Sequence, residues 1–245
     1  MNEPAAFDRR VLDRLVVAID GPSGSGKSTV ARGVATRLDL RYLDTGAMYR
    51  ALTWLAQRDG VAAGDDEALA KLASCWRFEI STDPVRPRVI ADDVEVTTAI
   101  RSSEVTAEVS AVSAVPAVRA ALVARQRDIV GAGGIVMEGR DTGTVVCPEA
   151  PVKIYLTASG GARALRRATE ERDRHRLVGD DVIALTQAEL DRRDQLDSSR
   201  DASPLRKAEG ALEVDTTALS ADEVIDVVVA ACRSVAASTA PSPPR

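Results

Sequence analysis

The sequence contains few of the residues that mark secreted, membrane or metal-binding proteins. Its 245 residues include three cysteines, one histidine, two tryptophans, three tyrosines and two phenylalanines. No apolar run approaches the roughly 20 residues that a bilayer-spanning helix needs. The charged N-terminus, MNEPAAFDRRVLDR, lacks the apolar core of a signal peptide. We therefore expect a cytoplasmic protein with no membrane partner.

The cysteines and the net charge exclude further classes. Cys75, Cys147 and Cys232 are far apart and follow no metal-ligand spacing, so we expect reduced thiols. A net charge of −5 argues against a surface that binds nucleic acid, and so few aromatic residues provide no stacking platform for single strands. The arginines nevertheless cluster at 161–176 and 192–207. Local arginine clusters on an acidic protein favour a small anionic ligand over a polyanion.

Apolar segments that resemble strands alternate with segments of helical spacing along most of the chain. We expect strands at 15–20, 41–44, 134–139, 151–158 and 211–217. Two of them, 134–139 and 151–158, are nearly continuous in apolar character, which is typical of strands buried on both faces of a parallel sheet. The sequence therefore predicts an α/β fold, with a five-stranded parallel sheet that carries helices on both faces.

One internal region and the two ends depart from this alternation. Residues 76–96 alternate apolar and polar side chains, which predicts a small antiparallel β insertion at the edge of a separate lobe. Ser220 and Glu223 form a capping box before a final helix. The first residues, 1–12, and the small, proline-rich tail, 237–245, are expected to be disordered.

The stretch GPSGSGKST, directly after the first strand, matches the pattern G-x-x-x-x-G-K-[ST]. Glycines let the backbone approach phosphate oxygens closely, and the helix that begins near Lys27 adds its positive end. Lys27 is expected to reach the β- and γ-phosphates, and the Ser28 hydroxyl to bind Mg²⁺. The predicted nucleoside triphosphate site comprises Gly21, Pro22, Ser23, Gly24, Ser25, Gly26, Lys27, Ser28 and Thr29.

Charged residues elsewhere extend the candidate site. Arg140 and Asp141 follow the third strand at its carboxyl end, where open α/β sheets bind ligands. Arg193 and Asp197 are four residues apart on one helix face, and Arg50 points away from the apolar stripe of its helix. Taken alone, Arg50 could be a solvated helix residue and Arg193 with Asp197 an exposed ion pair.

Together these stretches resemble the bacterial cytidylate kinase family of nucleoside monophosphate kinases. The resemblance runs from Leu15 to about Arg233. It is carried by IDGPSGSGKST, YLDTGAMYRA, IRSSEVTAEVSAVSAVPAVRAALVARQR, EGRDTGTVV with PEAPVKIYLTAS, and RRDQLDSSRDASPL with VDTTALSADEV. It implies transfer of the γ-phosphoryl group from ATP to CMP or dCMP, with Mg²⁺ as cofactor. We expect a monomer.

The resemblance also implies a division of the chain. The phosphate-binding core comprises 13–44, 121–160 and 186–236. A CMP-binding lobe extends over 45–120 and contains the β insertion, and a short helical lid over 161–185 closes on ATP.

For the acceptor, the resemblance implies a residue set that the motifs place on this chain. Cytosine contacts fall on Ser110, Arg119 and Asp141, α-phosphate contacts on Arg50, Arg140 and Arg200, sugar contacts on Arg193 and Asp197, and Thr45 lies near the nucleotide. The carboxylate of Asp141 can only accept hydrogen bonds, so it suits the exocyclic amino group of cytosine, whereas uracil carries a carbonyl there.

For the donor, the resemblance implies that Arg163 and Arg167 of the lid contact the triphosphate. Lys27, Arg140 and Arg200 are the expected catalytic residues, and they act by charge stabilisation without a general base. Because Glu138, rather than an aspartate, ends the third strand, we assign only Ser28 to Mg²⁺ and expect water at most of the remaining positions.

Three alternatives remain open on the residues alone. Another small phosphotransferase, such as an adenylate or shikimate kinase, shares the loop but not the cytosine contacts. A GTP-driven switch would carry an N-K-x-D motif, which the sequence lacks. A nucleic-acid-binding ATPase would be more basic and more aromatic.

Overall fold

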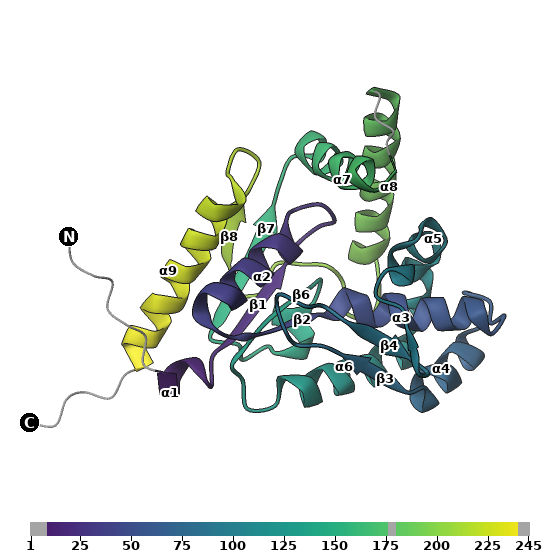
Figure 1. The fold of residues 1–245 in the computed structure, drawn as a ribbon, viewed down its shortest axis with the longest axis horizontal. Helices are drawn as coiled ribbons and strands as arrows, with labels where there is room; N and C mark the ends of the chain where they lie inside the picture. Colours follow the sequence, from purple (N-terminus) through teal and green to yellow (C-terminus); the bar gives the residue numbers. More distant parts are fainter. Residues whose placement is uncertain (1–8, 176–179, 240–245) are drawn as a thin grey trace, which may run out of the picture.

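A five-stranded parallel sheet forms the centre of the protein, of which the computed structural model describes residues 9–175 and 180–239. The spatial order is β2-β6-β1-β7-β8, and every neighbouring pair is parallel (Figure 1). The strands are β1 (Val16–Asp20), β2 (Arg41–Asp44), β6 (Ile135–Gly139), β7 (Val152–Thr157) and β8 (Leu212–Asp215). The predicted parallel sheet is confirmed.

Alternate side chains of the strands enter two separate hydrophobic cores, one on each face of the sheet. Ala18 belongs to the core with α3 (Thr45–Arg58) and α6 (Pro116–Val130). Its neighbour Ile19 belongs to the core with α2 (Lys27–Leu38) and α9 (Ala221–Thr239). Both side chains are buried, because a strand projects successive residues to opposite faces and each face has its own helices.

The chain ends are more ordered than the sequence predicted. Arg9–Leu12 forms the helix α1, and Leu12 is buried in the core shared with α2 and α9. At the other end α9 continues to Thr239. The expected disorder over 1–12 and 237–245 is therefore too long at both ends, since residues 9–12 and 237–239 are helical. The other residues that were expected to be disordered, 1–8 and 240–245, lie outside the described part of the chain.

The final helix begins as its sequence predicts. The backbone N–H of Ser220 donates to Glu223 Oε2 at 2.8 Å, and the N–H of Glu223 donates to Ser220 Oγ at 3.3 Å. This reciprocal pair confirms the predicted capping box.

A long segment lies between β2 and β6 in the sequence and contains a second, smaller sheet. It consists of α3, α4 (Asp66–Cys75), β3 (Phe78–Ile80), β4 (Val89–Ala91), β5 (Val94–Glu95), the 3₁₀ turn η1 (Ala99–Arg101), α5 (Ser103–Val112) and α6. The strands form a separate antiparallel sheet in the order β3-β4-β5, which confirms the predicted insertion.

The loop after β3 returns to the main sheet and lies along its edge. The backbone N–H of Tyr42, in β2, donates to the carbonyl of Thr82 at 2.8 Å. Arg32 Nε, from α2, donates to the carbonyl of Pro84 at 2.7 Å. This edge loop, Thr82–Pro84, therefore connects the insertion to both an edge strand and the helix that follows the phosphate-binding loop.

Two helices, α7 (Gly160–His175) and α8 (Asp180–Ser198), follow β7 and pack against each other (Figure 1). The expected lid, 161–185, covers α7 and the start of α8, so its boundary at 185 lies inside a helix. The expected lobe boundary at 120 likewise lies inside α6.

Within residues 9–175 and 180–239, no single helix has the length and apolar character to cross a membrane. Helices α5 and α6 reach that length and apolar character only together, as a pair bent by 101°.

Candidate active site

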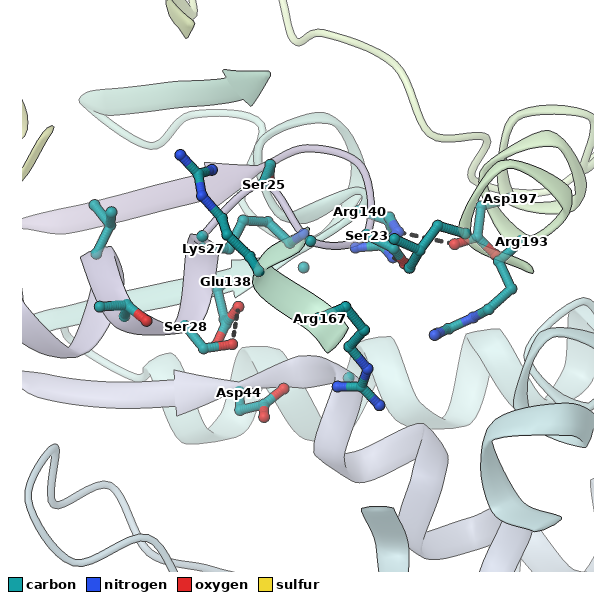
Figure 2. A pocket seen from close by; sticks show the side chains of 18 of the residues that line it. Ser23, Ser25, Lys27, Ser28, Asp44, Glu138, Arg140, Arg167, Arg193 and Asp197 are labelled. Carbon is teal, nitrogen blue, oxygen red and sulfur yellow. Dashed lines mark hydrogen bonds and ion pairs between the residues drawn. The ribbon is translucent and has the colours of Figure 1, made fainter. Parts of the chain in front are cut away.

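A cavity of about 620 Å³ lies beyond the carboxyl ends of β1, β2 and β6 (Figure 2). The structure brings most of the predicted site residues together around it: Ser23, Gly24, Ser25, Gly26, Lys27, Ser28, Thr29, Thr45, Arg50, Ser110, Arg119, Arg140, Asp141, Arg167, Arg193, Asp197 and Arg200. The predicted residues that do not line it are Gly21, Pro22 and Arg163.

The phosphate-binding loop starts at a position that only glycine fits. Gly21 has φ +149°, and a Cβ there would lie 2.1 Å from the carbonyl oxygen of Leu156 in β7. Several carbonyls of the loop accept hydrogen bonds from side chains: Lys27 Nζ donates to Pro22 O at 2.6 Å, and Thr216 Oγ1 donates to Ser25 O at 3.2 Å.

The loop also offers unused donors. Within the described chain, the backbone N–H groups of Gly24 and Gly26 have no hydrogen-bond partner. Because α2 begins directly afterwards, at Lys27, its positive end adds to these donors. The loop is therefore arranged to bind an anion.

Lys27 is a buried ammonium group inside this loop. Burial lowers its pKa, the charge of Arg140 lowers it further, and the carboxylate of Glu138 opposes both effects. Since the charged form of a buried amine is disfavoured without a compensating anion, a bound polyphosphate would stabilise the Lys27 ammonium group.

Glu138, at the end of β6, is the functional candidate that the sequence analysis left unassigned. Its Oε2 accepts a hydrogen bond from Ser28 Oγ at 3.0 Å, and its Oε1 accepts one from the Tyr42 hydroxyl (Figure 2). Burial raises the pKa of Glu138, and nearby Asp44 raises it further. Its position at the carboxyl end of a central strand was the signal that could have identified it.

These oxygens define where a metal could bind. The hydroxyl of Ser28 and the carboxylates of Glu138 and Asp44 are hard ligands of the kind that Mg²⁺ prefers. No group of three or more His, Cys, Asp or Glu side chains that could hold a metal occurs in the described residues. Phosphate and water oxygens would therefore have to complete the coordination shell.

Arg140 links the phosphate-binding loop to α8. Its Nε donates to Asp197 Oδ2 at 2.8 Å, and its two terminal nitrogens donate to Gly21 O at 3.0 Å and Ser23 Oγ at 2.6 Å (Figure 2). Arg200 donates to the other carboxylate oxygen of Asp197. Asp197 thus holds two of the predicted catalytic guanidinium groups beside the loop.

Two further arginines, Arg50 and Arg193, are half-buried in the wall of the same cavity. Burial and the charge of Arg193 lower the pKa of Arg50 to about 9. Burial and the charge of Arg140 lower the pKa of Arg193 to about 10. These shifts record mutual repulsion in a poorly solvated site, which a phosphate group placed among the arginines would relieve.

Arg119 and Asp141 meet at the base-binding end of the predicted acceptor site. Arg119 Nη2 donates to Asp141 Oδ2, and both residues are only 3% exposed. The Arg119 guanidinium also lies 5.0 Å from the centre of the Tyr49 ring. Ser113, which the sequence analysis did not single out, accepts from Arg119 through its carbonyl at 3.1 Å and from Arg200 through its hydroxyl at 2.9 Å.

Of the two α7 arginines that were expected to contact the triphosphate, only one lines the cavity. Arg163 does not face the cavity: it donates to Ser23 O and to Asp191 and Asp194 of α8. Both terminal nitrogens of Arg163 are thus engaged away from the cavity, and its contact with the triphosphate stays a prediction. Arg167 does line the cavity.

Arg166, between the two predicted arginines, was not identified from the sequence. It lines the cavity and donates to Thr216 Oγ1 at 2.8 Å and to Thr216 O. The sequence marked Arg166 only as a member of the arginine cluster at 161–176, and the cluster does not show which of its arginines faces the cavity.

Comparison with known proteins gives one consistent result. Residues 17–234 match the family model described as cytidylate kinase. The chain is 54% identical over 213 residues to a cytidylate kinase of Rhodococcus jostii (strain RHA1), which covers 86% of this chain and 92% of that protein. It is 50% identical over 217 residues to a cytidylate kinase of Streptomyces griseus subsp. griseus, which covers 88% and 91%. It is also 48% identical to a bifunctional pantoate ligase/cytidylate kinase of Synechococcus sp., over 94% of this chain and 42% of that protein.

Proposed function

The chain belongs to the cytidylate kinase family and is an enzyme that phosphorylates CMP, and we propose that it transfers the γ-phosphoryl group of ATP to CMP or dCMP. The products are ADP and CDP or dCDP. The observation that carries this proposal is a single cavity with a phosphate-binding loop, a group of buried arginines and a paired Arg119 and Asp141.

On the donor side, the unpaired N–H groups of Gly24 and Gly26 and the positive end of α2 bind the triphosphate. Lys27 then exchanges the carbonyl of Pro22 for phosphate oxygens and compensates their charge. Arg166 and Arg167 of α7 line the same cavity and complete the donor site.

Mg²⁺ fits the donor side of the site. Ser28, together with Glu138 and Asp44, would hold it, directly or through water. When bound, the ion would neutralise charge that develops on the phosphate oxygens. The protein side chains orient the nucleotides and exclude water.

On the acceptor side, Arg50, Arg140 and Arg200 surround the phosphate of CMP, and Arg193 and Asp197 contact its sugar. A phosphate oxygen is already ionised near neutral pH, so the acceptor needs no general base. Catalysis then consists of placing the two nucleotides in line and stabilising the charge of the transferring group. Asp197 fixes Arg140 and Arg200 for this task.

The base of CMP is selected by Ser110, Arg119 and Asp141. On binding, the two paired side chains turn from each other to the base: Arg119 donates to the carbonyl and ring nitrogen, and Asp141 accepts from the amino group. UMP offers a carbonyl in place of the amino group and leaves the Asp141 carboxylate unsatisfied, which costs about 1–3 kcal/mol.

The test is an ADP-release assay with ATP and a panel of CMP, dCMP, UMP, AMP and shikimate. We expect CMP and dCMP to give the highest kcat/KM values. Faster turnover of AMP or shikimate would contradict the proposal in favour of another small phosphotransferase.

The setting of the reaction is also part of the proposal. Cys75, Cys147 and Cys232 are all free, which suits the reducing cytoplasm. The monomeric state remains a prediction, which sedimentation of the purified chain tests.

A further inference from the structure

Ser23, at the tip of the phosphate-binding loop, is bound through all of its polar atoms by side chains from outside the loop. Its N–H donates to Asp194 Oδ1 at 2.9 Å, and its carbonyl accepts from Arg163 Nη1 at 2.9 Å. Its hydroxyl accepts from Arg140 Nη2 at 2.6 Å. The tip of the loop is therefore tied to α7, to α8 and to the segment after β6.

Arg163 and Asp194 also bind each other. Arg163 Nη1 donates to Asp194 Oδ2 as well as to the loop, and its Nη2 donates to Asp191 Oδ1 at 2.8 Å. The side chains of Arg163 and Asp194 are 9% and 15% exposed, whereas that of Asp191 is 53% exposed. Hydrogen bonds between charged groups are stronger where water is excluded, so Asp194 holds Arg163 more firmly than Asp191 does.

The backbone of the loop touches α7 at the same place. An ideal Cβ built on Gly24 would lie 3.0 Å from Arg163 Cβ and 3.1 Å from Arg163 O. No space remains between the loop tip and the helix, so the loop cannot turn there without moving α7.

We propose that Asp194 and Arg163 are positioning residues for the donor triphosphate. They hold Ser23 in one orientation, and the next free N–H groups, those of Gly24 and Gly26, consequently face the phosphates. Neither residue lines the cavity, so both act through the loop. The inference rests on ATP being the donor, as proposed above.

This arrangement predicts an effect on one substrate only. Arg140, which is assigned to the CMP site, also contacts the Ser23 hydroxyl, but Asp197 and the carbonyl of Gly21 hold it independently of Asp194 and Arg163. Loss of Asp194 therefore weakens ATP binding and leaves CMP binding unchanged. A general structural defect would weaken both.

The experiment compares Asp194→Ala, Asp194→Asn and the matched control Asp191→Asn, which keeps the loop contacts and changes only an exposed partner of Arg163. We expect Asp194→Ala to raise the KM for ATP about tenfold, since the hydrogen bonds of Asp194 with the Ser23 N–H and with Arg163 are both lost. Asp194→Asn keeps an acceptor for the Ser23 N–H and should raise the KM for ATP only about threefold. The KM for CMP and the effects of Asp191→Asn stay within about twofold.

Calorimetric titration of each variant with ATP alone and with CMP alone gives a measurement that does not depend on turnover. A parent enzyme that transfers phosphate from ATP, combined with an unchanged ATP affinity in both Asp194 variants, would overturn this inference and leave the proposed function intact. Equal losses for ATP and CMP would overturn it as well. A parent enzyme that ignores ATP would overturn the proposed function and, with it, the inference.

Discussion

Arg119 of α6 and Asp141, just after β6, form a buried ion pair in the wall of the cavity. Each residue is only 3% exposed. Without a bound nucleotide base, the Arg119 guanidinium and the Asp141 carboxylate therefore compensate each other's charge. A pyrimidine that replaces this contact must satisfy both of them, because a buried charge without a partner is costly.

Asp141→Ala is expected to reduce the preference for CMP over UMP. The variant loses the acceptor for the amino group of cytosine, so kcat/KM for CMP should fall between about fivefold and 150-fold while that for UMP changes little. Steady-state rates with both nucleotides measure the ratio. The control is Asp128→Ala, which removes an exposed carboxylate of α6. An unchanged CMP/UMP ratio in Asp141→Ala would refute the assignment of this residue to base selection.

Lys27→Ala is expected to abolish phosphoryl transfer. The variant removes the buried ammonium group that compensates the phosphate charge, and a loss of more than about 100-fold in kcat is expected. Initial rates under saturating nucleotide measure this loss, with Lys71→Ala, an exposed lysine of α4, as control. Turnover within about threefold of the parent would contradict the whole assignment of the loop.

Glu138→Gln is expected to increase the Mg²⁺ concentration that the reaction requires. Glutamine keeps the size of the side chain but lacks the charge beside Ser28, and a rise of about tenfold in the half-maximal Mg²⁺ concentration is expected. Titration of the rate with Mg²⁺ after removal of metal by chelation measures it. Glu79→Gln, on an exposed position of β3, is the control. Identical Mg²⁺ curves for Glu138→Gln and the parent would exclude a role for this carboxylate.

Asp197→Asn is expected to destabilise the protein in a pH-dependent manner. Burial raises the pKa of Asp197, but Arg140 and Arg200 outweigh burial and hold this pKa below its ordinary value. A depressed carboxyl pKa contributes stability that is complete above the unfolded pKa of about 4 and is lost as the pH falls through the folded pKa. The difference in unfolding free energy from the parent should thus be about 3 kcal/mol near pH 7 and shrink below about pH 4.

Urea denaturation at a series of pH values measures this difference. Asp226→Asn, on the exposed face of α9, provides the control, since its partner Arg37 is also exposed. A difference that stays constant down to pH 2–3 would show that the charge of Asp197 is not the cause.

The strands and the phosphate-binding loop could be predicted because their signals are local. An apolar run, a glycine-rich loop and a helix with regular spacing each lie within about a dozen residues, and the structure places them within a residue or two of the expected bounds. The capping box of Ser220 and Glu223 belongs to the same class, because it spans a single turn.

The partners of individual charged residues could not be predicted in this way. Ser28 and Glu138 are 110 residues apart in the sequence and meet only because β1 and β6 are neighbours in the sheet. Arg163 has the spacing of a ligand-binding residue, but the packing of α8 on α7 places two carboxylates within its reach. The first turn, Arg9–Leu12, contributes the buried Leu12 and pairs Arg9 with Asp39 of a distant segment, contacts that composition does not reveal.

The edge loop has a consequence for the behaviour of the protein in solution. Strand β2 is the last strand on its side of the sheet, and an exposed strand of this kind is a template on which other copies of a chain can add. Thr82 occupies the outward N–H of Tyr42, and Pro84, which has no N–H of its own, lies beside it. Because the edge loop occupies this border, fewer backbone groups remain for strand addition, and we expect a shortened loop to favour aggregation.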